Sequence, residues 1–442
     1  MTPRPGDAQP FGSGPLGSGA FDWVTAGWSA PHAPLDPVAL AQHWWNDWSL
    51  DVVWLDSSDG GTHLIGIGGT SLLAPDFAAF RAIVGGDLGA WVGWLGYEAG
   101  ADLLDLPRGE APRHPPVSLV ALDQWAVIRP DGTTTLHASL PSRAWTPPAS
   151  TLAGARVDEP ATPTPESSVA VLPGDSDEHL RARIADCIEH IVAGDAWVLC
   201  LTTTLWTTRP IDAFASHLRL RNASPVPRGG LLRINGTTLS SASMETFLSV
   251  HDGVATTSPI KGTRRRDPDP AIDAALAAEL AASPKERAEN LMIVDLCRND
   301  LGQLCRPGSV QVEELFAVHS YPTVHQLVST VSGRLRDGLG TVDAIAALFP
   351  AGSMTGAPKR RAVEILRTLE PWPRGIYSGC FGIFQADHCE AAMVIRSVVA
   401  DEDAAWIGVG AGITALSDPD EEVAEMHLKA EALLACLVPR TT

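Results

Sequence analysis

Two pairs of glutamates with the same spacing are the first residues that could carry chemistry in this chain of 442 residues. Glu286 and Glu289 stand in KERAENLMIVD, and Glu422 and Glu425 stand in DPDEEVAEMHLKA. A spacing of three residues places both members of a pair on one face of a helix. Two such faces across a pocket could bind a hard divalent cation, with Mg²⁺ as the natural choice, through oxygen ligands. The competing interpretation is a solvated helix surface, and the apolar run LMIVDL just after Glu289 argues against it.

A set of cationic side chains could bind an anionic ligand. They are Lys261 in SPIKGTRRR, Lys359 in GSMTGAPKRRAVEIL, Arg396 in VIRSVV, and Lys429. Arg396 stands in an apolar, strand-like run, where an unpaired guanidinium is costly and needs an anionic partner. That partner is either a carboxylate of the protein or one of a ligand. Glycines in WIGVGAGI, among them Gly410 and Gly412, would let backbone N–H groups approach an anion closely.

The elements that must position these residues follow from hydrophobic periodicity and capping signals. Helices are expected at residues 35–48, 177–193, 270–282, 284–296, 341–348, 358–369 and 418–437, the last with Asp418 as N-cap and Pro419 at its first position. Strands are expected at residues 51–54, 62–67, 197–206, 229–234, 237–243, 246–260, 377–384, 391–400 and 404–413. Long strand runs interrupted by a few helices indicate an α+β architecture, and not a regular βαβ alternation.

Composition limits the class of protein. A formal net charge of −20 argues against a general affinity for nucleic acid or an anionic membrane. The start of the chain resembles neither a signal peptide nor a transit peptide, and no apolar run approaches the ~18 to 20 residues of a membrane span. We therefore expect a cytoplasmic protein. Seven cysteines without a CxxC pair predict reduced, buried thiols, and not a disulfide or zinc framework.

Changes in composition divide the chain into four parts. Residues 1–20 are rich in Gly and Pro and are expected to be disordered, and residues 21–140 form an N-terminal region of short strands and turns. Residues 141–175 are rich in Pro, Ser and Thr, as in a linker or a long surface loop. Residues 176–442 contain all the candidate residues above.

Eight motifs in this last part resemble, in order and spacing, the chorismate-binding enzymes. They are SPIKGTRRR, AENLMIVDLCRNDLGQL, VHQLVSTV, FPAGSMTGAPKRRAVEIL, YSGCFGIF, IRSVV, GVGAGI and EEVAEMHLKA. More weakly, WLDSS and GWLGYEAG resemble the N-terminal region of the members that aminate chorismate. The resemblance implies the family's fold, an α/β sandwich of two large antiparallel sheets wrapped by helices.

The resemblance also implies a role for each candidate residue. The expected ligands of Mg²⁺, which would hold the ring carboxylate of chorismate, are Glu289 and Glu425, with Glu286 and Glu422 supporting them through water. Glu245 in SASMETFLSV is expected to be the general acid at the C4 hydroxyl, although Met244 stands where the family usually has Pro. The expected substrate-binding residues are Thr263, Ser353, Lys359, Tyr377, Arg396, Gly410, Gly412 and Lys429.

Two positions select among the members of the family. Val198 stands where the members that add water at C2 have a basic Lys, and a valine cannot take a proton. Lys261 stands where anthranilate synthases usually have Ala, so the resemblance is closest to aminodeoxychorismate synthase component I. Lys261 is then the covalent nucleophile of two allylic displacements that deliver nitrogen to C4. The alternative role for Lys261 is a cation that binds a substrate carboxylate.

Such a nucleophile must be neutral part of the time, and we expect nearby cations and partial burial to lower the pKa of Lys261. Two departures from the family pattern stand near these motifs. Gln326 occupies a position that is often His, and the position of Val198 is commonly Gln in the aminating members.

Partners follow from the same resemblance. No glutamine amidotransferase region is visible in the sequence, so we expect ammonia from a separate glutamine amidotransferase subunit. The product, 4-amino-4-deoxychorismate, is expected to pass to an aminodeoxychorismate lyase on the way to 4-aminobenzoate and folate, or to a specialised metabolite. Anthranilate synthase component I is the alternative enzyme, and a noncatalytic protein that binds chorismate or an amidotransferase is the alternative from another class.

Overall fold

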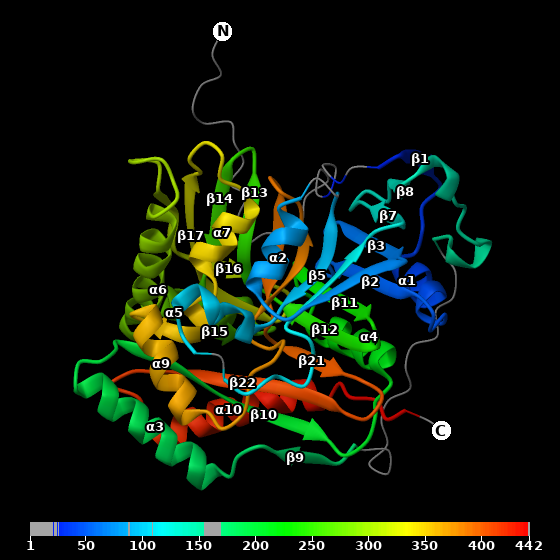
Figure 1. Ribbon diagram of the computed structural model, residues 1–442. Helices are drawn as coiled ribbons and strands as arrows, with labels where there is room; N and C mark the ends of the chain where they lie inside the picture. Colours follow the sequence, from blue (N-terminus) through cyan, green and yellow to red (C-terminus); the bar gives the residue numbers. More distant parts are fainter. Residues whose placement is uncertain are drawn as a thin grey trace.

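Two large antiparallel sheets form the body of the protein (Figure 1). The computed structural model describes residues 21, 24, 26–86, 89–107, 109–153 and 169–440. Across the 12-stranded sheet the order is β1 (Trp28–His32), β8 (Thr134–Ala138), β7 (Gln124–Ile128), β3 (His63–Gly68), β2 (Asp51–Asp56), β11 (Arg228–Ile234), β12 (Thr237–Ser243), β21 (Ser397–Ala400), β22 (Ala405–Ile413), β10 (Val198–Thr207) and β18 (Gly356–Ala357), with β9 (Val171–Pro173) also on β10. Across the 10-stranded sheet it is β15 (Ile260–Arg265), β17 (Val324–Arg334), β14 (Val254–Ser258), β13 (Thr246–His251), β20 (Cys389–Met393), β19 (Cys380–Phe384), β5 (Trp91–Leu95), β6 (Val117–Ala121) and β4 (Thr70–Ala74), with β16 (Gln311–Ser320) also on β17.

The core lies where the inner faces of the two sheets pack together. Val53 of β2 and Leu232 of β11 come from the 12-stranded sheet, and Trp94 of β5 and Phe381 of β19 come from the 10-stranded sheet. All four side chains are buried in one apolar cluster, and each such burial stabilises the fold by ~1.5 to 3 kcal/mol. The expected α+β sandwich of two antiparallel sheets is confirmed.

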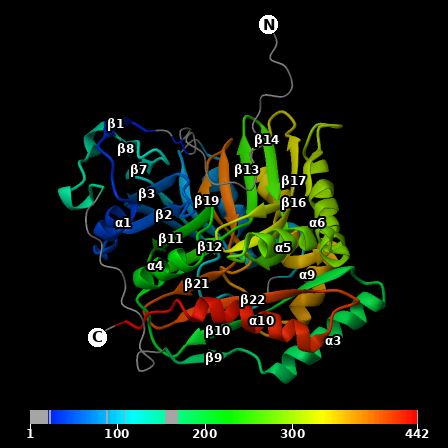
Figure 2. The same cartoon turned by 180° about the vertical axis from the view of Figure 1, so that it is seen from behind.

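Ten helices flank the sheets in the described part of the chain. They are α1 (Pro37–Trp45), α2 (Phe77–Val84), α3 (Asp177–Val192), α4 (Ala213–Ala223), α5 (Pro270–Ala282), α6 (Pro284–Gly302), α7 (Thr341–Leu348), α8 (Gly352–Thr355), α9 (Lys359–Leu369) and α10 (Pro419–Leu434). Asp418 caps α10 as expected, since its carboxylate accepts from two backbone N–H groups of the first turn. In Figure 2, α10 runs along β22 with α3 beside it. The helices α2, α4 and α8 were not predicted.

Helix α6 is longer than the sequence pattern indicates. We expected it to end at residue 296, but it continues to Gly302. Its inner face stays buried over this added length through Cys297 and Leu301. Continued burial of one face therefore accounts for the extra length of the helix.

The chain crosses between the two sheets at two adjacent points. The single strand that we expected at residues 391–400 is wrong, because β20 lies in the 10-stranded sheet and β21 lies in the 12-stranded sheet. Arg396 stands at this crossing with a left-handed φ of 46°, so it is not inside a strand. Glu245 stands at the other crossing, between β12 and β13. Backbone hydrogen bonds join the two crossings: Met393 N donates to Glu245 O (3.0 Å), and Ala242 N donates to Arg396 O (3.1 Å).

A buried ion pair also connects the sheets near these crossings. Arg228 of β11 pairs with Glu390 of β20, and both side chains are buried. Glu390 also accepts hydrogen bonds from Ser249 Oγ (2.8 Å) and from the ring of His251 (2.7 Å). Burial opposes the charged form, but these partners together lower the pKa of Glu390 to about 2.

The N-terminal region contributes strands to both sheets. Its strand β2 pairs with β11, and its strand β5 pairs with β19. The described ends of the predicted linker at 141–175 also pack on the body: Trp145 contacts Trp44 with 4.9 Å between ring centroids, and β9 pairs with β10. Residues 154–168, and the predicted disordered residues 1–20, lie outside the described residues.

The state of the cysteines agrees with the composition. All seven cysteines are buried and unpaired, which confirms the expectation of free thiols. Among the described residues, no helix has both the length and the apolar character needed to cross a membrane.

Candidate active site

Lys261 lies where the two sheets meet. It belongs to β15 of the 10-stranded sheet, and its Nζ lies beside Gly412 on β22 of the 12-stranded sheet. A Cβ at position 412 would come within 2.9 Å of that Nζ, so glycine leaves the space that the amine needs. The buried side chain of Val198 would lie 3.8 Å from the same Cβ position. Lys261, the predicted nucleophile, and Val198, which replaces the basic Lys of the hydrating enzymes, therefore lie on the same side of Gly412.

The charge around Lys261 differs from our expectation. Burial disfavours the charged amine, but charge interactions with Cys200 and with the carboxylates of Glu289 and Glu245 outweigh it, so the pKa of Lys261 is raised. The expectation that nearby cations lower this pKa is wrong, because the groups that face the amine are acidic. The amine becomes a nucleophile only when some of this negative charge is offset.

Glu245, at the crossing between β12 and β13, is a buried acid. Ser353 Oγ of α8 donates a hydrogen bond to its carboxylate at 2.5 Å. Burial raises the pKa of Glu245 to about 7, although the Ser353 hydrogen bond and the charge of Lys261 act in the opposite direction. Met244, the departure from the family's Pro, is fully buried in an apolar cluster. Glu245 is therefore protonated about half of the time at neutral pH and can donate a proton.

The two glutamate pairs lie on helices that pack beside Lys261. Helix α6 packs on β15, and α10 packs on β22. Burial and the like charges of Glu286 and Glu422 raise the pKa of Glu289. Burial alone would raise the pKa of Glu425 too, but the Lys429 ammonium at 2.6 Å lowers it.

The four carboxylates are held by different partners in this structure. Glu286 pairs with Arg264 at 3.2 Å, and Glu422 accepts a hydrogen bond from Ser417 Oγ at 2.8 Å. Across the described ranges, no three His, Cys, Asp or Glu side chains come close enough together to hold a metal. The donors still fit Mg²⁺, because they are oxygen ligands from two facing helices whose like charges repel one another, and a cation relieves that repulsion.

The residues expected to bind carboxylates fall into two groups. Arg396 has no ion pair or side-chain hydrogen bond within the part of the chain that the structure describes, and burial lowers its pKa. No protein carboxylate pairs with Arg396 among the described residues, and a ligand carboxylate as its partner stays a prediction. Lys429 donates to Gly410 O at 2.9 Å, so it lies over the glycines of β22.

Lys359 lies away from these residues: its buried ammonium pairs with Asp300 at 2.7 Å and donates to two carbonyl groups at the end of α7. These bonds use its donors, and we no longer assign it to the substrate.

The remaining expected contacts surround the same strands. The ring of Tyr377 is packed against Gly408 of β22, where a Cβ would lie 2.2 Å from it. Thr263 is exposed and pairs across β15 and β17 with Gln326. The Oε1 of Gln326 is buried without a hydrogen-bond partner among the described residues. Gln326, which replaces the family's usual His, therefore places this buried hydrogen-bond acceptor next to β15, the strand that contains Lys261.

Arg374 is a buried residue that sequence patterns did not single out. It forms an ion pair with Glu370 at 2.7 Å and donates to the backbone oxygens of Met354 (2.6 Å) and Cys200 (2.8 Å). Met354 follows Ser353 in α8, and Cys200 pairs with Gly412. Its guanidinium also lies 4.3 Å from the ring centroid of Tyr97 in the N-terminal region. Arg374 thus positions both sides of the site, and only the long-range fold reveals this.

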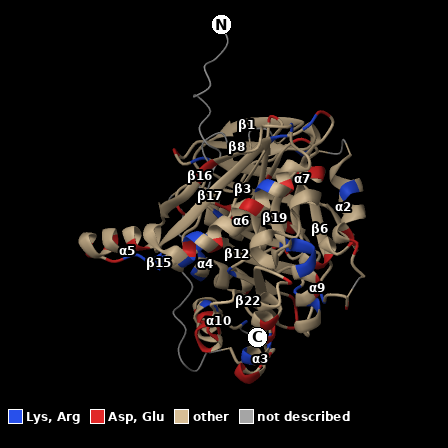
Figure 3. Ribbon diagram, turned by 90° about the vertical axis from the view of Figure 1, so that its left-hand side faces the viewer, with Lys and Arg blue, Asp and Glu red and all other residues tan. Residues whose placement is uncertain are grey.

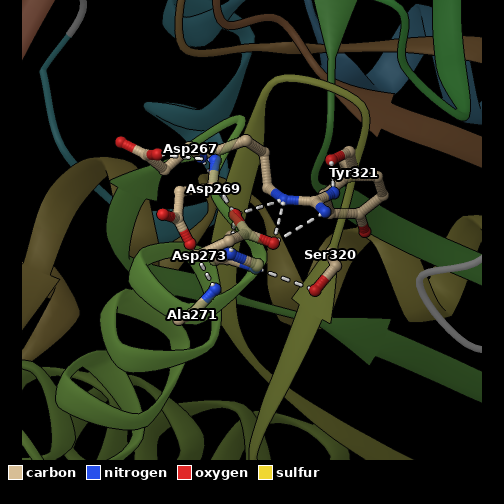
Figure 4. Close-up of polar contacts among 8 residues, drawn as sticks. Asp267, Asp269, Ala271, Asp273, Ser320 and Tyr321 are labelled. Atoms are coloured by element: carbon tan, nitrogen blue, oxygen red, sulfur yellow. Dashed lines mark hydrogen bonds and ion pairs between the residues drawn. The ribbon is translucent and has the colours of Figure 1, made fainter.

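A second polar cluster near β15 is structural (Figure 4). The His325 ring bonds both Ser320 Oγ (2.8 Å) and Asp273 (2.9 Å), an order that resembles a hydrolytic triad. Asp273, however, is held in a bidentate ion pair by Arg266, and the Asp267 N–H also donates to it. The cluster fastens α5, which projects from the body in Figure 3, to the strands that follow Lys261.

Comparisons with known proteins give the family and the fold. A family model described as chorismate binding enzyme matches residues 71–435. An aminodeoxychorismate synthase of Streptomyces pristinaespiralis is 44% identical over 366 residues, which are 78% of this chain and 50% of that protein. The anthranilate synthase component 1 of Streptomyces coelicolor is 37% identical over 377 residues, which are 79% of this chain and 73% of that protein. The chain spans about half the length of the aminodeoxychorismate synthases of Streptomyces pristinaespiralis and Streptomyces griseus.

Solved structures share the same fold at low sequence identity. The menaquinone-specific isochorismate synthase of Escherichia coli has a TM-score of 0.73 at 18% identity, covering 93% of this chain and 95% of that one. Anthranilate synthase component I of Streptococcus pneumoniae has a TM-score of 0.70 at 22% identity, covering 93% and 92%.

Proposed function

Because the chain belongs to the family of chorismate-binding enzymes, we propose that it aminates chorismate at C4 and makes 4-amino-4-deoxychorismate. The observation that carries the proposal is the position of Lys261, whose amine lies beside Gly412 and interacts with Glu245, Glu289 and Glu425. A lysine at this position can act as a nucleophile, whereas the Ala that anthranilate synthases usually have there cannot. Val198 beside it cannot activate water for attack at C2. The aminodeoxychorismate synthases at 40 to 44% identity support the same activity.

The chemistry takes two displacements. The Lys261 amine forms a bond to C2, the ring double bond shifts, and the C4 hydroxyl leaves as water with a proton from Glu245. Ammonia then forms a bond to C4, the double bond shifts back, and the bond from C2 to Nζ breaks with its electron pair returning to Lys261. Each step forms one bond to nitrogen and breaks one bond at the ring. Arg396 and Lys429 would hold the substrate carboxylates during both steps.

Magnesium is the cofactor that we propose for this site. Glu289 and Glu425 would bind it directly, and Glu286 and Glu422 would support it through water. When bound, Mg²⁺ supplies positive charge that binds the ring carboxylate and offsets the acidic groups that keep Lys261 protonated.

The proposed partners supply and use the nitrogen. A glutamine amidotransferase would deliver ammonia to the site, and an aminodeoxychorismate lyase would act on the product. The resulting 4-aminobenzoate would serve folate biosynthesis or a specialised metabolite. Free ammonia should replace the amidotransferase in the test tube.

The test is a product analysis with chorismate, Mg²⁺ and ammonium at mildly alkaline pH, with and without added lyase. We expect 4-aminobenzoate only when the lyase is present, and none from Lys261→Ala, whose chorismate affinity should be nearly unchanged. Anthranilate as the product would assign the chain to anthranilate synthase component I and make Lys261 a binding residue. Full turnover by Lys261→Ala to the 4-amino product would remove the covalent mechanism.

A further inference from the structure

A small hollow lies next to Glu245. It is bounded by side chains of α6, of the strands β13 and β14, and of the segment that leads into α8. Of the residues assigned to the site, only Glu245 and Ser353 line it; Lys261, Arg396 and Glu289 do not. The hollow is therefore a side chamber that reaches the site through the general acid.

One face of α6 forms the floor of this chamber. Ile293, Cys297 and Asp300 line it, at spacings of four and three residues, so they lie on one stripe of the helix. The same stripe begins four residues before Ile293, at Glu289. Helix α6 thus carries a proposed metal ligand at one level and the chamber floor at the next.

The size and lining of the chamber fit a small hydrogen-bond donor. It has room for about one molecule the size of water. Its polar groups include the carboxyls of Glu245 and Asp300. Lys359 pairs with Asp300 and donates its other hydrogens to two carbonyl groups, so it has no donor left for a molecule in the chamber. Burial raises the pKa of the Cys297 thiol to about 12, so this group stays neutral. A lining of acceptors and uncharged groups favours a neutral molecule with several N–H or O–H donors.

We propose that this chamber is the ammonia site of the enzyme, and that it exchanges the water released from C4 for the incoming ammonia. The inference rests on the proposed amination. In the first displacement Glu245 gives its proton to the departing hydroxyl, which becomes water. In the second, the bond from nitrogen to C4 forms, the bond from C2 to Lys261 breaks, and the Glu245 carboxylate takes the extra proton from the new C4 nitrogen. One carboxyl serves both transfers because it borders both the ring and the chamber.

The test fills the chamber from the α6 side, away from Lys261, Arg396 and Glu289. Cys297→Leu adds bulk to the floor and Asp295→Leu adds bulk on the exposed face of the same helix, so the two form a matched pair. We expect Cys297→Leu to raise the KM for ammonia by about tenfold or more, a loss equivalent to ~1.4 kcal/mol of binding, while the dissociation constant of chorismate stays unchanged. Asp295→Leu should keep the wild-type KM for ammonia. Thr257→Val, which removes a lining hydroxyl at similar volume, provides a second variant that should raise the ammonia KM if Cys297→Leu does not fold.

The outcomes separate the two proposals. If wild-type protein makes the 4-amino product and both Cys297→Leu and Thr257→Val keep the wild-type ammonia KM, the chamber is not the ammonia site. An equal rise of the chorismate dissociation constant and the ammonia KM would also overturn the inference, because the chamber would then be part of the chorismate pocket. If wild-type protein makes no 4-amino product from chorismate and ammonium, the proposed function fails, and the ammonia site fails with it.

Discussion

Replacing Glu245 by glutamine should make the protein more stable and less active. The amide has nearly the size of the carboxyl and can still accept the Ser353 hydrogen bond, but it has no acidic proton to give to the C4 hydroxyl. Positioned proton transfer is worth about 10² to 10⁴ in rate, so kcat/KM for chorismate should fall by that factor. Burial of Glu245 explains both the loss of activity and the gain in stability. It keeps the carboxyl protonated, which the reaction needs, and it makes the ionised carboxylate destabilise the fold.

The gain in stability follows from the pKa. Glu245 has a pKa of about 7 in the fold, against 4.5 for an ordinary glutamate. A raised carboxyl pKa means that the unfolded state releases its proton first, so the penalty starts as the pH rises through 4.5 and is complete above about 7. At 1.36 kcal/mol for each pKa unit, the penalty is about 2 kcal/mol at pH 6 and about 3 kcal/mol at pH 8. Glu245→Gln removes it.

Two assays check this prediction. Urea unfolding should show Glu245→Gln gaining about 1 kcal/mol more over wild type at pH 8 than at pH 6. With chorismate varied at saturating ammonia, the ratio of wild-type to variant kcat/KM should fall about tenfold per pH unit above about 7, because only the wild type loses the acidic proton there, whereas the titration of Lys261 affects both proteins. Activity within a few-fold of wild type, or equal stability at both pH values, would refute the assignment of Glu245 as a buried general acid.

Three further predictions concern the surroundings of the site. Glu289→Gln or Glu425→Gln should raise the Mg²⁺ concentration for half-maximal activity by about tenfold, equivalent to ~1.4 kcal/mol of binding, and full activity of both variants with a chelator present would contradict the metal site. Arg374→Ala leaves a buried carboxylate unpaired and should lower the free energy of unfolding by about 3 to 5 kcal/mol, whereas Arg374→Lys should recover part of the stability and leave kcat low, as measured by thermal unfolding and initial rates. Glu390, whose pKa is about 2, should stabilise the fold by about 3 kcal/mol at pH 7 and about 1 kcal/mol at pH 3, since a lowered carboxyl pKa gives stability that is lost as the pH falls below 4.5; urea unfolding of Glu390→Gln should therefore show a smaller loss relative to wild type at the lower pH.

The sequence predicted the local parts of this architecture well. Helices α5 and α7 have the expected bounds, and α10 begins where Asp418 and Pro419 indicate. These features depend on capping and on periodicity, which neighbouring residues determine. The structure brings Lys261 beside Gly412 of β22, as two separate motifs suggested, and the chemical role of Lys261 stays a prediction.

The parts that failed depend on residues far apart in the chain. The apolar run at 391–400 looks like one strand, but its two halves pair with different sheets, and no local pattern marks the crossing at Arg396. The basic residue Lys359 resembles an anion ligand in its motif, yet the fold brings Asp300 to it. The pKa of Lys261 was expected in the wrong direction, because the acidic groups that face it come from other elements. Pairing between strands, and the charges that it gathers, follow from tertiary structure and not from local propensity.

The shared strands make the N-terminal region inseparable from the rest of the protein. A fragment that begins at residue 176 would lose β2 and β5 and would expose the backbone edges of β11 and β19 at the same time. Such open edges are templates for intermolecular pairing, so we expect the fragment to aggregate. Chimeras between relatives would meet the same constraint, because an exchanged N-terminal region must match two strand pairings at once, β2 with β11 and β5 with β19. The strands of residues 21–140 and those of the remaining chain should therefore evolve, and be engineered, as one folding unit.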